Sequence, residues 1–166
     1  KESFDITTGT STKKYQKENL KFKEQYIKEK LSKIKFDFES EPEPKITSLL
    51  ELLPDSYEKY NDIRKKLSYS TDTKIILKLN DDKFVVISCD GNGFEINTSE
   101  EIKNIKKSIS IDVDKRLLYW LLQGPKLAQW NNVEIGSHLQ FKRIPDIYER
   151  GLIHCLNYFY SGQYVN

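Results

Sequence analysis

The chain has 166 residues, which predicts a single main domain whose core buries most of the apolar surface of the unfolded chain. Its net charge of +2 is too small to predict a nucleic-acid partner or a membrane partner for the chain as a whole. No apolar run approaches the roughly 20 residues of a bilayer span, so we expect no membrane-spanning segment.

The cysteine and methionine content bears on compartment and origin. Cys89 and Cys155 both stand within apolar runs, where buried free thiols are favoured over a disulfide between them. Free thiols and the lack of a signal peptide are typical of a cytoplasmic protein. The chain begins with Lys1 and contains no methionine. We therefore expect a fragment or a processed product of a longer protein.

Residues 1–44 are predicted to form an N-terminal segment, and residues 45–166 an α+β domain. Phe4–Ile6 predicts a short strand that leads into a polar loop. Apolar spacing at Leu20, Ile27, Leu31 and Ile34 predicts a helix over 13–35. The rest of that helix carries nine lysines and three glutamates. Such a basic face is either a solvated surface or an element that binds membrane surfaces or anions.

The middle of the chain predicts helices followed by a hairpin. Pro42 and Pro44 indicate a hinge or stiff linker. Ile46–Leu53 predicts a short amphipathic helix ended by Pro54, and a second helix is expected over Ser56–Leu67. Apolar and β-branched residues then predict three strands joined by turns. These strands are Lys74–Leu79, Lys83–Cys89 and Phe94–Ile96.

Ser108–Val113 alternates apolar and polar residues, which predicts a half-buried strand. Asp114 is placed to cap a Leu-rich helix in which Trp120 is expected to be buried, and Gly124 is placed to end it. Further apolar residues predict a strand pair or a bent strand, with Gly136 as a bulge. They are Val133, Ile135, Leu139 and Phe141.

Asp146 and Glu149 have the spacing of a capping box and predict the start of the last helix. Arg143 is predicted to pair with one of these two carboxylates, with anion recognition as the alternative.

Histidine and cysteine spacing does not predict a metal site within this chain. A zinc site needs three or four ligands with compatible spacing. His138 and His154 are the only histidines, and the adjacent His154 and Cys155 point in different directions on a helix. We therefore expect no metal and no catalytic residue in this chain. His138 alone is a candidate acid–base group, or a strand histidine bonded to a neighbour.

Aromatic, amide and carboxylate residues gather after Gln129 and indicate a ligand-binding pocket. The alternative is that the asparagines satisfy turn backbone while Trp130 fills the core. The candidate ligand-binding residues are Trp130, Asn131, Asn132, Glu134, His138 and Arg143.

The segment 121–159 also carries a family resemblance. A Trp followed by two polar residues, an Ile-Gly pair, and the string Arg143-x-Pro145-Asp146-Ile147-Tyr148 lead into an aromatic-rich helix. This pattern resembles the C-terminal end of metallo-β-lactamase-fold enzymes of the CMP-N-acetylneuraminate hydroxylase type. The resemblance implies an upstream catalytic domain that holds a metal in the parent protein. The family's His-x-His-x-Asp-His motif is absent from this chain, so no metal ligand is carried over.

The order of elements is also similar to sterol-carrier-protein-like domains, which hold amphipathic ligands between sheet and helices. We therefore expect an α+β fold with a twisted, mainly antiparallel sheet and helices mostly on one face. The expected role is a non-catalytic, substrate-binding or assembly domain of a metal-dependent hydrolase-like enzyme. The alternatives are a free-standing module for lipid-like or other amphipathic small molecules and a dimerisation or partner-docking domain.

Overall fold

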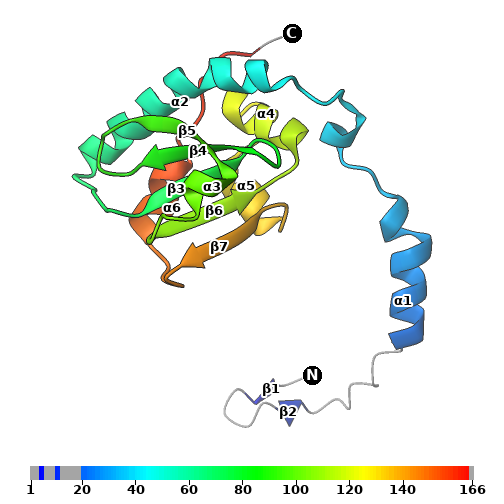
Figure 1. Cartoon of the computed structure of the whole chain (residues 1–166). Coiled ribbons are helices and arrows are strands. Elements are labelled where there is room, and N and C mark those ends of the chain that lie inside the picture. The colour runs from blue at the N-terminus through cyan, green and yellow to red at the C-terminus, as the bar shows by residue number, and fades with distance from the viewer. Residues whose placement is uncertain (1–3, 6–9, 12–19, 165–166) are drawn as a thin grey trace. The chain divides into compact units, whose positions relative to one another are not determined.

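The computed structural model describes residues 4–5, 10–11 and 20–164 (Figure 1). The chain divides into two compact units, Lys1–Ser40 and Glu41–Asn166. The boundary predicted after residue 44 falls four residues beyond this division. None of the helices in the described part of the chain is both long enough and apolar enough to cross a membrane.

The first unit contains short elements only. Strand β1 (Phe4–Asp5) pairs antiparallel with β2 (Thr10–Ser11). Helix α1 (Leu20–Glu29) is followed by two 3-10 turns, η1 (Leu31–Lys33) and η2 (Asp37–Ser40). The helix expected over 13–35 is therefore shorter at its C-terminal end, and residues 13–19 lie outside the described residues.

Helix α2 (Ile46–Lys66) is one continuous helix, so the expected break at Pro54 is wrong. A proline inside a helix removes one backbone hydrogen bond. Pro54 lies on the exposed side, where water can satisfy the carbonyl that loses its partner. Leu53 before it and Tyr60 after it are fully buried. Burial of one face on both sides of the proline keeps the helix continuous.

The second unit is built on a five-stranded sheet in the order β5-β4-β3-β6-β7. All neighbouring pairs are antiparallel except β3 and β6, which run parallel. The fold is therefore α+β with a mainly antiparallel sheet, as predicted. The strands are β3 (Lys74–Lys78), β4 (Lys83–Ser88), β5 (Phe94–Thr98), β6 (Ser108–Asp112) and β7 (Gln140–Ile144).

The central strands β3 and β4 each bury three consecutive residues, so both faces of the sheet are covered at its centre, and one face carries the main core. Ile75, Ile87 and Ile109 pair in register across β4, β3 and β6, and all three are buried. Helices α2, α4 (Lys115–Gln123) and α6 (Arg150–Leu156) pack together over this face (Figure 1). Helix α3 (Ser99–Ile102) lies by the opposite face, against β4 and β5.

Helix α4 has the predicted caps. The Asp114 carboxylate accepts a hydrogen bond from the Arg116 backbone N–H at 2.9 Å, and Gly124 ends the helix with a φ of 132°. The four leucines of α4 are buried, but Trp120 is only half-buried, so its expected place in the core is wrong. Trp120 lies next to the buried side of α4 and lines a surface groove with Pro42 and Pro44.

Two elements near the C-terminus differ from the prediction. Residues Trp130–Ile135 form helix α5 rather than a strand, and β7 begins only at Gln140. Trp130 and Val133, three residues apart, are the buried pair of α5. That spacing suits one helix face, whereas Ile135 is exposed. Helix α6 begins at Arg150 and has no side-chain cap, so the expected capping box is wrong.

Candidate functional site

Trp130, the first residue of α5, is a buried anchor. Its side chain is 3% exposed, and its indole Nε1–H donates a hydrogen bond to the backbone carbonyl of Phe159 at 2.9 Å. The centres of the Trp130 and Phe159 rings lie 6.5 Å apart. This bond ties the start of α5 to the segment that follows α6. A buried indole usually needs such a partner for its N–H group.

The two asparagines after Trp130 lie on the exposed first turn of α5, so they do not form the expected turn. Asn131 lines a surface hollow, while Asn132 is exposed and does not. The backbone carbonyl of Asn132 accepts a hydrogen bond from the N–H of Gly136 at 2.8 Å. Asn131 is therefore a candidate binding residue, whereas Asn132, the next residue of the helix, is not.

The hollow beside Asn131, here called the aromatic–amide hollow, has a volume of about 300 Å³. That size is at the lower end of the range for small-molecule sites. Amide groups, an imidazole and aromatic rings line it together. The lining residues are Pro125, Ala128, Gln129, Trp130, Asn131, His154, Asn157, Tyr158 and Tyr160.

Helix α6 supplies one wall of this hollow because its two faces differ. Leu152 and Leu156 point into the core, while His154 is exposed on the other face. Asn157 and Tyr158 follow three and four residues after His154, which places them on the same side. The imidazole and the Tyr158 ring lie 5.7 Å apart. The wall thus offers two rings, tilted at 54° to each other, beside an amide.

The amides give this hollow its chemical character. An amide side chain donates and accepts hydrogen bonds at once, and tyrosine hydroxyls do the same. This donor and acceptor set suits a polar ligand with a flat or apolar face rather than a strongly charged one.

The other predicted site residues lie apart from this hollow. His138 is in the connection between α5 and β7, and its ring packs over Gly136, where a Cβ would come within 2.8 Å of its Cδ2. Glu134 is half-buried on α5. Neither of them lines the hollow. The predicted set therefore contributes only Trp130 and Asn131 to it.

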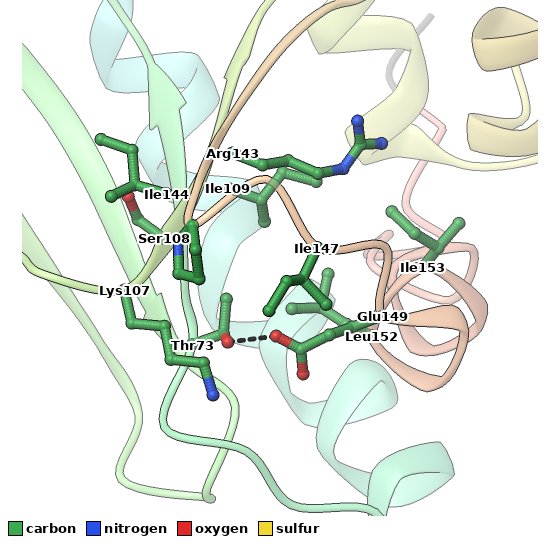
Figure 2. Close-up of a pocket in the computed structure, with 11 residues that line it drawn as sticks. Thr73, Lys107, Ser108, Ile109, Arg143, Ile144, Ile147, Glu149, Leu152 and Ile153 are labelled. Atoms are coloured by element: carbon green, nitrogen blue, oxygen red, sulfur yellow. Dashed lines mark hydrogen bonds between the residues drawn. The ribbon is translucent and has the colours of Figure 1, made fainter.

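Arg143 belongs to a second place, the small cavity around Glu149 (Figure 2). Its guanidinium carbon lies 5.1 Å from the centre of the Phe141 ring and 5.7 Å from that of Tyr148. In Figure 2 the guanidinium group points away from Glu149. Among the described residues no ion pair joins Arg143 to Asp146 or Glu149, so the predicted pair is wrong. Guanidinium–ring contacts of this kind are weakly attractive at exposed positions.

Glu149 was not predicted as a centre of interactions, yet its carboxylate joins three parts of the fold. It accepts a hydrogen bond from the Tyr69 hydroxyl at 2.9 Å and another from the Thr73 hydroxyl. Tyr69 and Thr73 precede β3, about 80 residues earlier in the chain. A single-sequence pattern has no signal for partners at that separation.

The surroundings of Glu149 hold it ionised. Burial opposes its charge, but the surrounding hydroxyl donors, led by Thr73, outweigh burial and keep the pKa of Glu149 below its ordinary value. Burial, with the bond to Glu149, raises the pKa of Tyr69. The cavity beside it measures about 10 Å³, room for one water molecule at most. This site is therefore a structural junction and does not hold a substrate.

Metal ligands do not gather in the described part of the chain, where no group of three or more His, Cys, Asp or Glu side chains could hold an ion. Both cysteines are free thiols in the core. Burial raises the pKa of Cys89 to about 11 and also raises the pKa of Cys155. Protonated, buried thiols are poor nucleophiles and poor metal ligands.

Comparison with known proteins does not assign the chain to a class. No family model, no curated protein and no solved structure matches it.

Proposed function

We propose that the chain is the non-catalytic, substrate-binding C-terminal domain of a metal-dependent, metallo-β-lactamase-fold hydrolase-like enzyme. In this proposal the upstream catalytic domain supplies the metal and the reactive groups. The present domain supplies a surface that holds part of the substrate. The observation that carries the proposal is the aromatic–amide hollow, whose lining residues all fall between Pro125 and Tyr160.

The two ends of the segment with the family resemblance are held together beside this hollow. Trp130 is bonded to the carbonyl of Phe159, and the N–H groups of Ser161 and Gly162 donate to the carbonyls of Leu122 and Gln123. The end of α4, the start of α5 and the end of α6 are thereby held together. A fixed frame of this kind keeps the lining groups pre-organised, which lowers the entropic cost of binding.

Proton–nitrogen NMR spectra of the labelled chain test the proposal directly. The chain has two tryptophans, so it gives two indole N–H signals, and only Trp130 lines the hollow. We expect a neutral sugar or a nucleoside, titrated separately, to shift the Trp130 signal while the Trp120 signal stays constant. Equal movement of both signals, or of neither with all probes, would contradict the proposal.

Asn131→Ala and Asn132→Ala form a matched pair for the same titration. Both side chains are exposed on one turn of α5, and only Asn131 lines the hollow. The loss of one ligand hydrogen bond should weaken binding about three- to tenfold in Asn131→Ala. Asn132→Ala should bind as the unchanged chain does. In the parent enzyme, the same pair should differ in KM rather than in kcat.

A second candidate, a module for lipid-like molecules, is favoured by a different surface. The sheet face under α3 has a hollow of about 310 Å³ with Ile76, Phe84, Ile102 and Phe141 among its lining residues. Its walls also carry polar groups, so an amphipathic molecule would suit it. Titration with a fatty acid, dodecanoate, separates the candidates. Shifts at Phe84 and Ile102 without a shift of the Trp130 indole would favour this second function.

A further inference from the structure

Helix α1 and the turn η1 carry a strong local positive charge that the net charge of the chain conceals. Residues 20–35 contain six lysines and two glutamates. All of these charged side chains are exposed. A cationic segment of this length attracts an anionic surface over about a Debye length, roughly 8–10 Å at physiological salt.

The same segment exposes large apolar side chains. Ile27 lies on α1, Leu31 lies in η1 and Ile34 directly follows η1. Their spacing of four and three would put them on one side of a helix that continued through residue 34 on binding. Phe22 is 67% exposed and Ile34 is 61% exposed. Tyr26, Ile27 and Leu31 are exposed as well. An exposed apolar stripe of this kind usually marks an interaction surface.

The charged and apolar groups are arranged side by side. A helix that continued from α1 through residue 35 would place Lys23 and Lys30 on one flank of the Ile27–Leu31–Ile34 stripe. It would place Lys28 and Lys35 on the other flank, with Glu24 beside Lys28. Long lysine stems reach along an apolar surface and place their ammonium groups at its edge. This arrangement is typical of helices that lie in the plane of a bilayer interface.

We propose that residues 20–35 bind the surface of an anionic lipid bilayer, with the isoleucine and leucine side chains inserted among the acyl chains and the lysines at the headgroups. The charge complementarity selects this occupant, since lysines on both flanks match a uniformly negative plane. Each lysine near such a surface strengthens binding by about fivefold. The proposal is independent of the aromatic–amide hollow and of the proposed enzyme role.

Sedimentation with vesicles tests this proposal on the whole chain. One set of vesicles is pure phosphatidylcholine, and the other contains about 30% phosphatidylserine, near the anionic content of a charged leaflet. We expect at least tenfold stronger partitioning onto the anionic vesicles at about 0.1 M salt and a fall of about tenfold at 0.5 M salt. Helical circular dichroism should rise on binding.

Two pairs of variants separate specific binding from general stickiness. Ile27→Ser with Ile34→Ser should weaken binding about tenfold or more, because two apolar side chains no longer insert. Its matched control is Ile96→Ser with Ile135→Ser, which removes two exposed isoleucines from the second unit. Lys28→Gln with Lys30→Gln should also weaken binding, whereas Lys65→Gln with Lys66→Gln at the end of α2 should not.

Near-ultraviolet circular dichroism of each variant monitors the folded core. Equal loss of binding in a test pair and its control would overturn the proposal. So would equal binding to both kinds of vesicle, or no binding to either kind. Absence of binding to either kind of vesicle would favour a protein partner for the apolar stripe.

Discussion

The hydroxyl of Tyr69 donates a hydrogen bond of 2.9 Å to the carboxylate of Glu149, which is 80 residues away in the chain. Glu149 directly precedes α6, and Tyr69 lies between α2 and β3. The bond therefore connects the last helix of the second unit to the entry of its central strand. Because the Thr73 hydroxyl donates to the same carboxylate, the ionised form of Glu149 is the one that this junction favours.

Glu149→Gln tests the charge at this junction through the pH dependence of stability. The pKa of Glu149 is lowered in the fold from its ordinary value of 4.5. A lowered folded pKa contributes stability that is present above the unfolded pKa and is lost as pH falls through the folded pKa. We expect Glu149→Gln to cost about 1–2 kcal/mol at pH 7, with the difference shrinking below about pH 4.5.

Urea titrations at pH values from 3 to 7 measure this difference. Glu95→Gln, which changes an exposed glutamate on β5, is the matched control and should shift stability little at any pH. If the curves for the unchanged chain and Glu149→Gln run parallel down to pH 3, the charged form of Glu149 has no stabilising role.

The tryptophans should respond very differently to the same substitution. Trp130→Phe removes the indole N–H and leaves the buried carbonyl of Phe159 without that donor. We expect a loss of about 1–3 kcal/mol in the free energy of unfolding. Trp120→Phe changes a half-buried residue and should cost below about 1 kcal/mol. Equal losses, measured by urea titration, would show that the Nε1–carbonyl bond contributes nothing particular.

Local sequence signals were sufficient for the elements whose bounds are set by neighbouring residues. Apolar and β-branched residues between turns predicted β3, β4 and β5 almost to their ends, and alternation predicted β6. Asp114 with Gly124 predicted the bounds of α4. These features depend on residues close together in sequence, so a single sequence contains them.

The errors arose where distant contacts decide the local structure. The spacing of Val133 and Ile135 suggested a strand, but the bond from Trp130 to Phe159 and the burial of Val133 favour a helix. Glu149 has a capping-box spacing from Asp146, but its carboxylate is taken by Tyr69 and Thr73. The prediction of the candidate site was partly wrong for the same reason. His154 and Tyr158 join Asn131 only after α5 and α6 meet.

Gly124 should be intolerant of a side chain for two reasons that a matched pair can separate. Its φ is 132°, and a Cβ there would lie 2.9 Å from the hydroxyl oxygen of Tyr164 and 3.2 Å from Cδ2 of Tyr160. Gly93 has a φ of 93° with open space around it. Gly93→Ala should cost about 1 kcal/mol from backbone strain alone. Gly124→Ala should cost more, about 2–4 kcal/mol, because crowding adds to strain. If both variants lower the melting temperature equally, crowding by Tyr160 and Tyr164 does not contribute to the cost of Gly124→Ala.

The two cysteines should be almost unreactive in the folded chain. Cys89 and Cys155 have no exposed surface, and burial raises the pKa of Cys89 to about 11. At pH 8 only about one Cys89 thiol in a thousand is then a thiolate, the form that attacks a disulfide reagent. We expect both thiols to react with Ellman's reagent at least about a hundredfold more slowly in the native chain than in guanidinium. Cys89→Ala and Cys155→Ala variants, each with one remaining thiol, assign the two rates.

Since a buried thiol reacts only when its surroundings open, the slower thiol reports the opening of the more stable part of the core. Rapid reaction of Cys155 alone would show that α6 opens without the sheet, in contradiction to the junction that Glu149 forms with Tyr69 and Thr73.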